Sequence, residues 1–120
     1  MDSKKFHILS FKYAFQGIVA ALKEEPNLKI HFIIAVLVLA LAYFLQIIRQ
    51  DWINIFFVIG FVFAIELTNT AIEAIVDAFT DKSHPGAKLA KDISAGAVLV
   101  SSITAAIVGV LIFLPYILNG

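Results

Sequence analysis

The sequence predicts an all-α integral membrane protein, in which an N-terminal amphipathic surface helix is followed by three transmembrane helices. Hydrophobic residues make up 61% of the 120 residues and charged residues only 15%, whereas soluble domains contain about 25% charged residues. Three apolar runs approach or exceed the roughly 20 residues that a helix needs to cross a bilayer. A soluble chain of this length is too small to bury so much apolar surface. We expect residues 1–120 to form one domain.

Three apolar runs define the predicted spans. The spans are, in chain order, about residues 30–48, 52–79 and 93–118. Only His31 and Gln46 interrupt the first run with polar side chains. Residues 49–51 are predicted to form the turn after it, and Trp52 then opens the second span as an interfacial aromatic residue.

Residues from about 4 to 24 show a different periodicity. One sector of the helical wheel collects six apolar side chains, and the adjacent sector is polar and rich in lysine. The apolar sector contains Ile8, Phe11, Phe15, Ile18, Val19 and Leu22. Lys5, Lys12 and Lys23 belong to the adjacent sector. This pattern is typical of a helix that lies on a membrane surface with its lysines toward anionic headgroups.

The basic residues predict the orientation of the chain. Eight of the nine precede the first span or separate the second from the third, and only Arg49 lies between the first two spans. The eight are Lys4, Lys5, Lys12, Lys23, Lys29, Lys82, Lys88 and Lys91. Because basic residues in short loops favour the cytoplasmic side, we expect the N-terminus and the loop at 80–91 to be cytoplasmic and the C-terminus to be outside.

A stripe of polar residues runs along the second span. Glu66, Asn69, Glu73 and Asp77 stand at positions i, i+3, i+7 and i+11, which places them on one helix face, and Thr70 widens the stripe. Counting about 20 core residues from the start of this span places Glu66 about 9 Å inside its cytoplasmic edge. Ionisable side chains at such depth are costly and mark functional sites. The stripe therefore lies where a lipid headgroup and a cytoplasmic solute can meet.

Two flanking segments on the same side carry charges that complement this stripe. One is the junction at 23–31, and the other is the loop at 81–92. Each is also typical of ordinary charged membrane flanks. Beside a buried carboxylate stripe, they supply cations for phosphate oxygens and further carboxylates for Mg²⁺, which prefers oxygen ligands.

Charge and cysteine content exclude several kinds of site. The formal net charge is zero, so nothing indicates a nucleic-acid partner. The absence of cysteine excludes disulfides and thiolate metal sites. His31 and His84 are not paired at metal-ligand spacing, and we expect them to be interfacial residues and not zinc ligands.

The segments ELTNTAIEAIVD and AKDISAGAVL, at 66–77 and 90–99, carry a resemblance to a known family. With the surface helix and three spans, the chain resembles the bacterial diacylglycerol kinase and undecaprenol kinase family over almost its whole length. Residues 25–31 look more like the undecaprenol kinase branch. Pro26 and Lys29 stand where that branch commonly has arginine.

The resemblance implies a homotrimer in the bacterial inner membrane that uses ATP and Mg²⁺, with active sites between subunits. By position, Glu66 corresponds to the catalytic base, with Asn69 beside it. Glu25 and Glu73 correspond to the metal-binding carboxylates. The implied nucleotide-binding residues are Glu25, Glu73, Asp77, Lys91 and Asp92. The implied lipid-binding residues are Glu66, Asn69 and Lys29, and His84 aligns with a nearby polar position.

These observations predict a kinase that phosphorylates the hydroxyl of a membrane lipid alcohol, undecaprenol in the first place and otherwise diacylglycerol. One alternative is a small proton- or ion-coupled carrier that uses Glu66 and Glu73 as relay groups. Another is a non-catalytic membrane scaffold, which leaves the buried Glu66 without a role.

Overall fold

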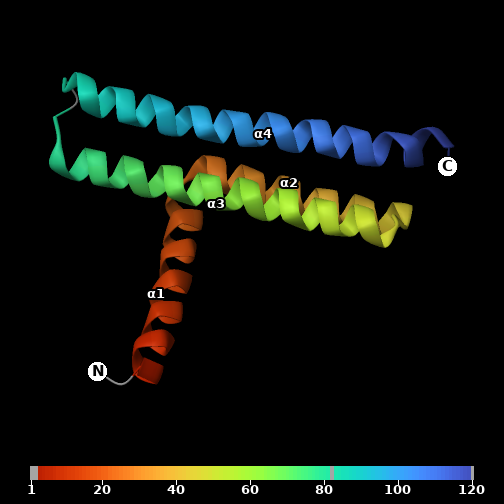
Figure 1. Ribbon diagram of the computed structural model, residues 1–120, viewed down its shortest axis with the longest axis horizontal. Helices are drawn as coiled ribbons and strands as arrows, with labels where there is room; N and C mark the ends of the chain where they lie inside the picture. Colours follow the sequence, from red (N-terminus) through yellow and green to blue (C-terminus); the bar gives the residue numbers. More distant parts are fainter. Residues whose placement is uncertain (1–2, 82, 120) are drawn as a thin grey trace.

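Four helices form the whole of the described structure (Figure 1). The computed structural model describes residues 3–81 and 83–119. The helices are α1 (Ser3–Glu24), α2 (Pro26–Leu45), α3 (Arg49–Phe79) and α4 (Pro85–Asn119). Lys82 and the side chains of Lys4 and Lys5, which contributed to the predicted orientation, lie outside the described part.

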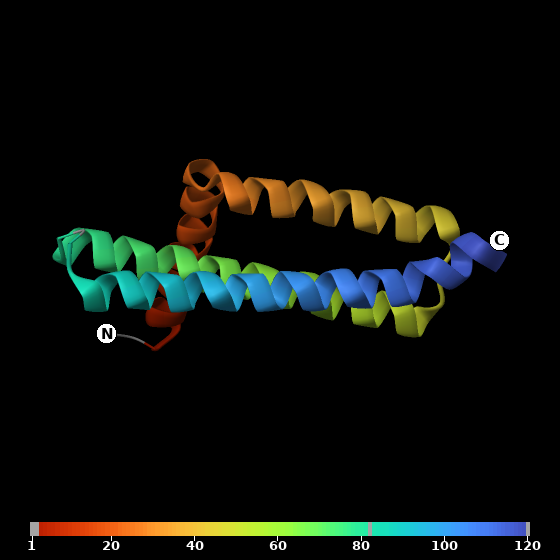
Figure 2. The ribbon, with the colours of Figure 1, turned by 90° about the horizontal axis from the view of Figure 1, so that it is seen from above.

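The three long apolar helices run side by side, while α1 lies across their direction (Figure 1). Figure 2 shows α3 and α4 as a close pair and α2 on one side of them. The packing between α3 and α4 is the most extensive between any two helices, and α1 contacts both α2 and α3. The end of the bundle where α3 stops and α4 starts is called the α1 end.

Helices α2, α3 and α4 are each long and apolar enough to cross a bilayer, which confirms the predicted all-α architecture with three spans. Most large apolar side chains on these helices point outward, and Phe57 of α3, for example, is 74% exposed. The apolar sector of α1 is also uncovered, with Phe11 78% and Phe15 68% exposed. Such surfaces are stable where lipid or another apolar partner replaces water.

The break between α1 and α2 is set by proline chemistry. Pro26 occupies the first turn of α2, where its missing N–H is not needed. The ring of a proline disfavours helical backbone at the preceding residue, and Glu25 is accordingly extended, with φ −102° and ψ 110°. As a result, α2 begins four residues before the predicted span, and it carries Lys29 and His31 on its first two turns.

The turn between α2 and α3 lies three residues earlier than predicted. Gln46 ends α2 in the left-handed conformation, with φ 54°, and its backbone N–H donates to the carbonyl of Tyr43. Ile47 is buried in the core, so the chain has already reversed before Arg49. Residues 49–51 therefore form the first turn of α3 and not the predicted loop.

Helix α4 begins eight residues before the predicted third span. The side chain of Asp81 accepts a hydrogen bond from the Ser83 N–H, and Nδ1 of His84 accepts one from the Ala87 N–H. His84 thus caps the N-terminus of α4, and Pro85 occupies its first position. This local chemistry turns most of the predicted 81–92 loop into helix and places Lys91 on it.

At the opposite end of the bundle, a small apolar core lies beside a tyrosine whose hydroxyl makes two hydrogen bonds. The core is formed by Ala42, Ile47, Ile55, Ile112 and Phe113. Beside it, the Tyr116 hydroxyl donates to the Asp51 carboxylate at 2.7 Å and accepts the Ile48 N–H at 3.0 Å. One tyrosine thereby fastens α4 to the turn between α2 and α3.

Replacing Tyr116 with phenylalanine should lower the thermal unfolding midpoint by several degrees, because Asp51 and the Ile48 N–H would both lose their partner. The midpoint can be measured by circular dichroism at a fixed detergent concentration. Tyr43→Phe is the matched control, since the side chain of Tyr43 is 80% exposed. Equal midpoints for the two variants would contradict the role given to Tyr116.

Candidate functional site

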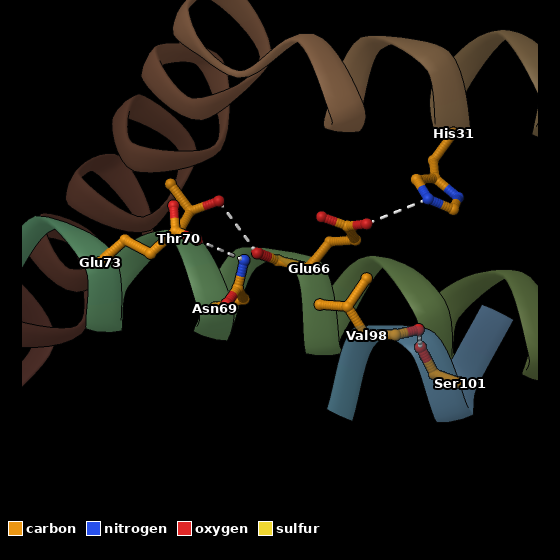
Figure 3. A network of polar contacts seen from close by, with 7 residues as sticks. All are labelled: His31, Glu66, Asn69, Thr70, Glu73, Val98 and Ser101. Atoms are coloured by element: carbon orange, nitrogen blue, oxygen red, sulfur yellow. Dashed lines mark hydrogen bonds and ion pairs between the residues drawn. The ribbon is translucent and has the colours of Figure 1, made fainter. Parts of the chain in front are cut away.

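Among the residues whose burial is described, one carboxylate is buried, and it lies between α2 and α3. Glu66 of α3 is only 3% exposed, and its Oε1 lies 3.0 Å from Nε2 of His31 on α2. Figure 3 shows the two side chains pointing toward each other across the space between the helices. Burying a carboxylate away from water costs several kcal/mol unless it is paired or hydrogen-bonded, so this contact compensates for an otherwise costly burial.

The distance between Glu66 and His31 fits an ion pair, but the direction of the imidazole N–H does not meet hydrogen-bond geometry. Oε1 is thus left without a directed hydrogen bond from any described residue. The outer torsion of a histidine side chain is soft, so a modest ring rotation would align the N–H with Oε1. The carboxylate is close to a donor and still able to accept a proton.

Asn69 lies one turn further along α3 and connects two neighbouring side chains, of which Figure 3 shows that of Glu73. Its amide Nδ2 donates to Oε1 of Glu73 at 3.3 Å, and its Oδ1 accepts the Ser94 hydroxyl of α4 at 2.6 Å. The amide is therefore held from both sides in one orientation. Thr70 does not compete for these groups, because its hydroxyl donates to the backbone carbonyl of Glu66 at 3.0 Å.

Charged pairs follow toward the tips of α3 and α4. Lys91 Nζ lies 2.8 Å from Asp77 Oδ1 and thereby links the two helices. Lys88 pairs with Asp92 within α4 at 2.6 Å. Both pairs are largely exposed, so each contributes little to stability and can exchange partners at small cost.

The structure brings together only part of the predicted site. Glu66, Asn69, Glu73 and Asp77 occupy one stripe of α3 as predicted, and Lys91 joins it from α4. Glu25 is half-buried at the N-terminus of α2, and the Lys29 side chain is exposed. Asp92 forms an ion pair with Lys88, whereas Lys91 forms one with Asp77.

Two polar partners were not predicted. His31 was expected to be an interfacial residue only, yet it contacts the buried carboxylate of Glu66. Ser94, which carried no predicted role in the site, is 7% exposed and fixes Asn69. Both residues could have been found from their depth in the membrane. His31 lies in the first predicted span and Ser94 in the third, each near the level of the α3 residue that it contacts.

An apolar groove of about 570 Å³ leads away from this site, between α2 and α4 and over α3. His31 lines the groove, and of its other lining residues only Ser102 is polar. The lining continues to Ile117 near the far end of α4. The polar contact of His31 with Glu66 thus adjoins a long apolar groove. An amphiphile with one polar end requires such an arrangement.

The described residues contain no group of three or more His, Asp or Glu side chains placed to hold a metal ion. Mg²⁺ keeps several waters and is held through one or two carboxylates plus substrate phosphates. Glu25 and Glu73 are half-buried carboxylates outside the ion pairs of the described residues.

Comparison with known proteins identifies the family. Residues 12–113 match the model of prokaryotic diacylglycerol kinase. The chain is 45% identical over 106 residues to an undecaprenol kinase of Bacillus subtilis, covering 88% of this chain and 86% of that protein. It is 37% identical over 113 residues to a diacylglycerol kinase of Synechocystis, covering 93% of this chain and 65% of that protein.

A further relative is the diacylglycerol kinase of Haemophilus influenzae, which is 31% identical over 108 residues, with 88% of this chain and 92% of that protein covered. The match thus extends over both α1 and the three spans, and it includes the buried stripe of α3. The chain belongs to the prokaryotic diacylglycerol kinase family and is a membrane-embedded lipid kinase.

Proposed function

We propose that this protein transfers the γ-phosphoryl group of ATP, with Mg²⁺, to the hydroxyl of a membrane lipid alcohol, preferentially undecaprenol and otherwise diacylglycerol. The observation that carries the proposal is the buried Glu66, whose Oε1 lacks a directed hydrogen bond and whose neighbour His31 lines an apolar groove. A carboxylate kept inside a membrane helix at this cost is expected to serve a function.

The preference for undecaprenol rests on two observations. Identity is 45% to an undecaprenol kinase and 37% and 31% to two diacylglycerol kinases. The groove is a single apolar channel that runs from His31 to Ile117, and this shape suits one long isoprenoid chain better than two acyl chains.

Glu66 would act as the general base. It would accept the proton of the lipid hydroxyl while the oxygen attacks the γ-phosphorus and the bond to the leaving ADP breaks. Asn69, held by Glu73 and Ser94, would orient the hydroxyl or the base. Phosphoryl transfer depends mainly on alignment and charge neutralisation, and a fixed amide beside the base provides alignment.

The nucleotide would bind toward the tips of α3 and α4. Glu25 and Glu73 would hold Mg²⁺, which when bound offsets negative charge on the phosphates. Lys91 would neutralise phosphate oxygens by exchanging its contact with Asp77, and Asp77 and Asp92 would line the nucleotide side. Lys29, exposed on the first turn of α2, would face the lipid phosphate product.

The same proposal includes the setting of the enzyme. We place residues 1–120, as one kinase domain, in the bacterial inner membrane, with the α1 end in the cytoplasm where ATP is available and the C-terminus outside. The lysines at this end support that orientation. A homotrimer with active sites between subunits would cover part of the exposed apolar surface of the spans.

The carrier alternative gains no support from the groove. A path for ions needs polar groups along its length, whereas the lining between His31 and Ile117 is apolar apart from Ser102. Three of the four acidic residues of α3 lie instead in its second half, and two of these three, Glu73 and Asp77, bond to Asn69 and Lys91.

A direct test offers undecaprenol and diacylglycerol at equal mole fraction to the purified protein in mixed micelles with Mg-ATP, and measures the labelled phospholipid products. We expect undecaprenyl phosphate to predominate, and chelation of Mg²⁺ to stop its formation. A predominance of phosphatidic acid would overturn the lipid preference. Absence of product from every lipid alcohol offered would overturn the choice of acceptor.

Glu66→Gln should reduce turnover by at least about 100-fold, because an amide cannot accept the hydroxyl proton. Helical content and elution volume in detergent should stay unchanged, since the side chain keeps its size. Glu24→Gln, which removes an exposed carboxylate of α1, is the control and should keep its turnover. Full activity of the Glu66 variant would exclude Glu66 as the base.

Glu73→Gln should raise the Mg²⁺ concentration needed for half-maximal rate by about 10-fold, because an amide is a weaker ligand than a carboxylate. The hydrogen bond from Asn69 survives this change, since an amide oxygen still accepts it. Rates measured against Mg²⁺ at fixed ATP and fixed lipid report the effect. A magnesium curve that coincides with that of the unmodified enzyme would refute the metal-binding role.

A further inference from the structure

His31 is placed to act on Glu66 through one specific oxygen. Its Nε2 lies 3.0 Å from Oε1, and the imidazole is 23% exposed while the carboxylate is almost completely enclosed. At this distance the imidazole can donate its Nε2–H to the carboxylate after a modest ring rotation. The contact also bridges α2 and α3, whose packing against each other is less extensive than that of α3 and α4.

No other described side chain is in a position to fix this carboxylate. Oε1 accepts no directed hydrogen bond, and the nearest amide, that of Asn69, is committed to Glu73 and Ser94. A glutamate side chain without a partner samples several rotamers. A base must instead present one oxygen to the hydroxyl whose proton it takes.

We propose that His31 is a positioning residue for Glu66: its Nε2–H donates to Oε1, which holds the carboxylate in one rotamer and leaves Oε2 for the lipid hydroxyl. This inference rests on the proposed role of Glu66 as the base. The substrate proton passes to Oε2 as the O–H bond breaks, the electron pair of that bond stays on the lipid oxygen, and this oxygen forms the new bond to the γ-phosphorus while the bond from phosphorus to the leaving ADP breaks. His31 itself neither receives that proton nor touches the phosphate.

The location of His31 supports this role over a purely structural one. The imidazole lines the apolar groove, so it stands where the polar end of a bound lipid alcohol would meet the carboxylate. A contact needed only for helix packing could be made by two apolar side chains, since replacing both members of a buried ion pair with apolar residues is often neutral or stabilising.

The test compares three variants of the full-length protein in mixed micelles. His31→Gln keeps an N–H donor at a reach similar to that of Nε2, His31→Asn keeps the amide but shortens the side chain, and His31→Phe keeps the ring without a donor. We expect kcat to fall about 10-fold or more in the Phe and Asn variants, with the KM for Mg-ATP unchanged, and the Gln variant to retain most of the turnover. Wild-type kcat in the Phe or Asn variant, or equal losses in the Gln and Asn variants, would overturn the inference.

A double-mutant cycle separates this inference from the proposed function. If His31 acts through Glu66, combining His31→Asn with Glu66→Gln should lower kcat no further than Glu66→Gln alone. Independent, multiplied losses would overturn the positioning role. An active Glu66→Gln enzyme refutes the base itself, whereas an inactive one together with a fully active His31→Asn enzyme refutes only the role of His31.

Discussion

The arrangement of the site depends on the burial of one carboxylate inside a bundle that faces lipid. An ionised side chain at this depth is stable only with a partner, and Glu66 finds it in His31 across the space between α2 and α3. That requirement fixes how α2 is rotated and how deeply it sits relative to α3. The break at Pro26 sets where α2 begins, and thus which residue of α2 reaches the level of Glu66.

The polar stripe combines two different environments along one helix. Near Glu66 the surroundings are closed and the contacts are few, whereas Asp77 and Lys91 form an exposed pair about three turns further on. Asn69 lies between them and is fixed by Glu73 and Ser94. One helix therefore carries an enclosed carboxylate at one level and exposed, exchangeable ion pairs about three turns further on.

The three spans and the polar stripe of α3 could be predicted from the sequence, because both depend on properties of single helices. Periodicity alone places Glu66 and Asn69 on one face, and hydropathy alone finds the three spans. The partners on other helices could not be found in this way, since the contact of His31 with Glu66 depends on the relative rotation of α2 and α3. The helix ends at Gln46 and His84 were missed for a local reason, namely that side-chain and left-handed caps override hydropathy.

The use of histidine beside Glu66, in place of a permanent cation, is consistent with a carboxylate that must react. A lysine or arginine at this position would compensate burial more strongly, but it would also hold the carboxylate ionised and weaken it as a proton acceptor. An imidazole can be a neutral donor and leaves the second carboxylate oxygen free. The contact of His31 with Glu66 therefore compensates for burial without a permanent positive charge, and it engages Oε1 alone.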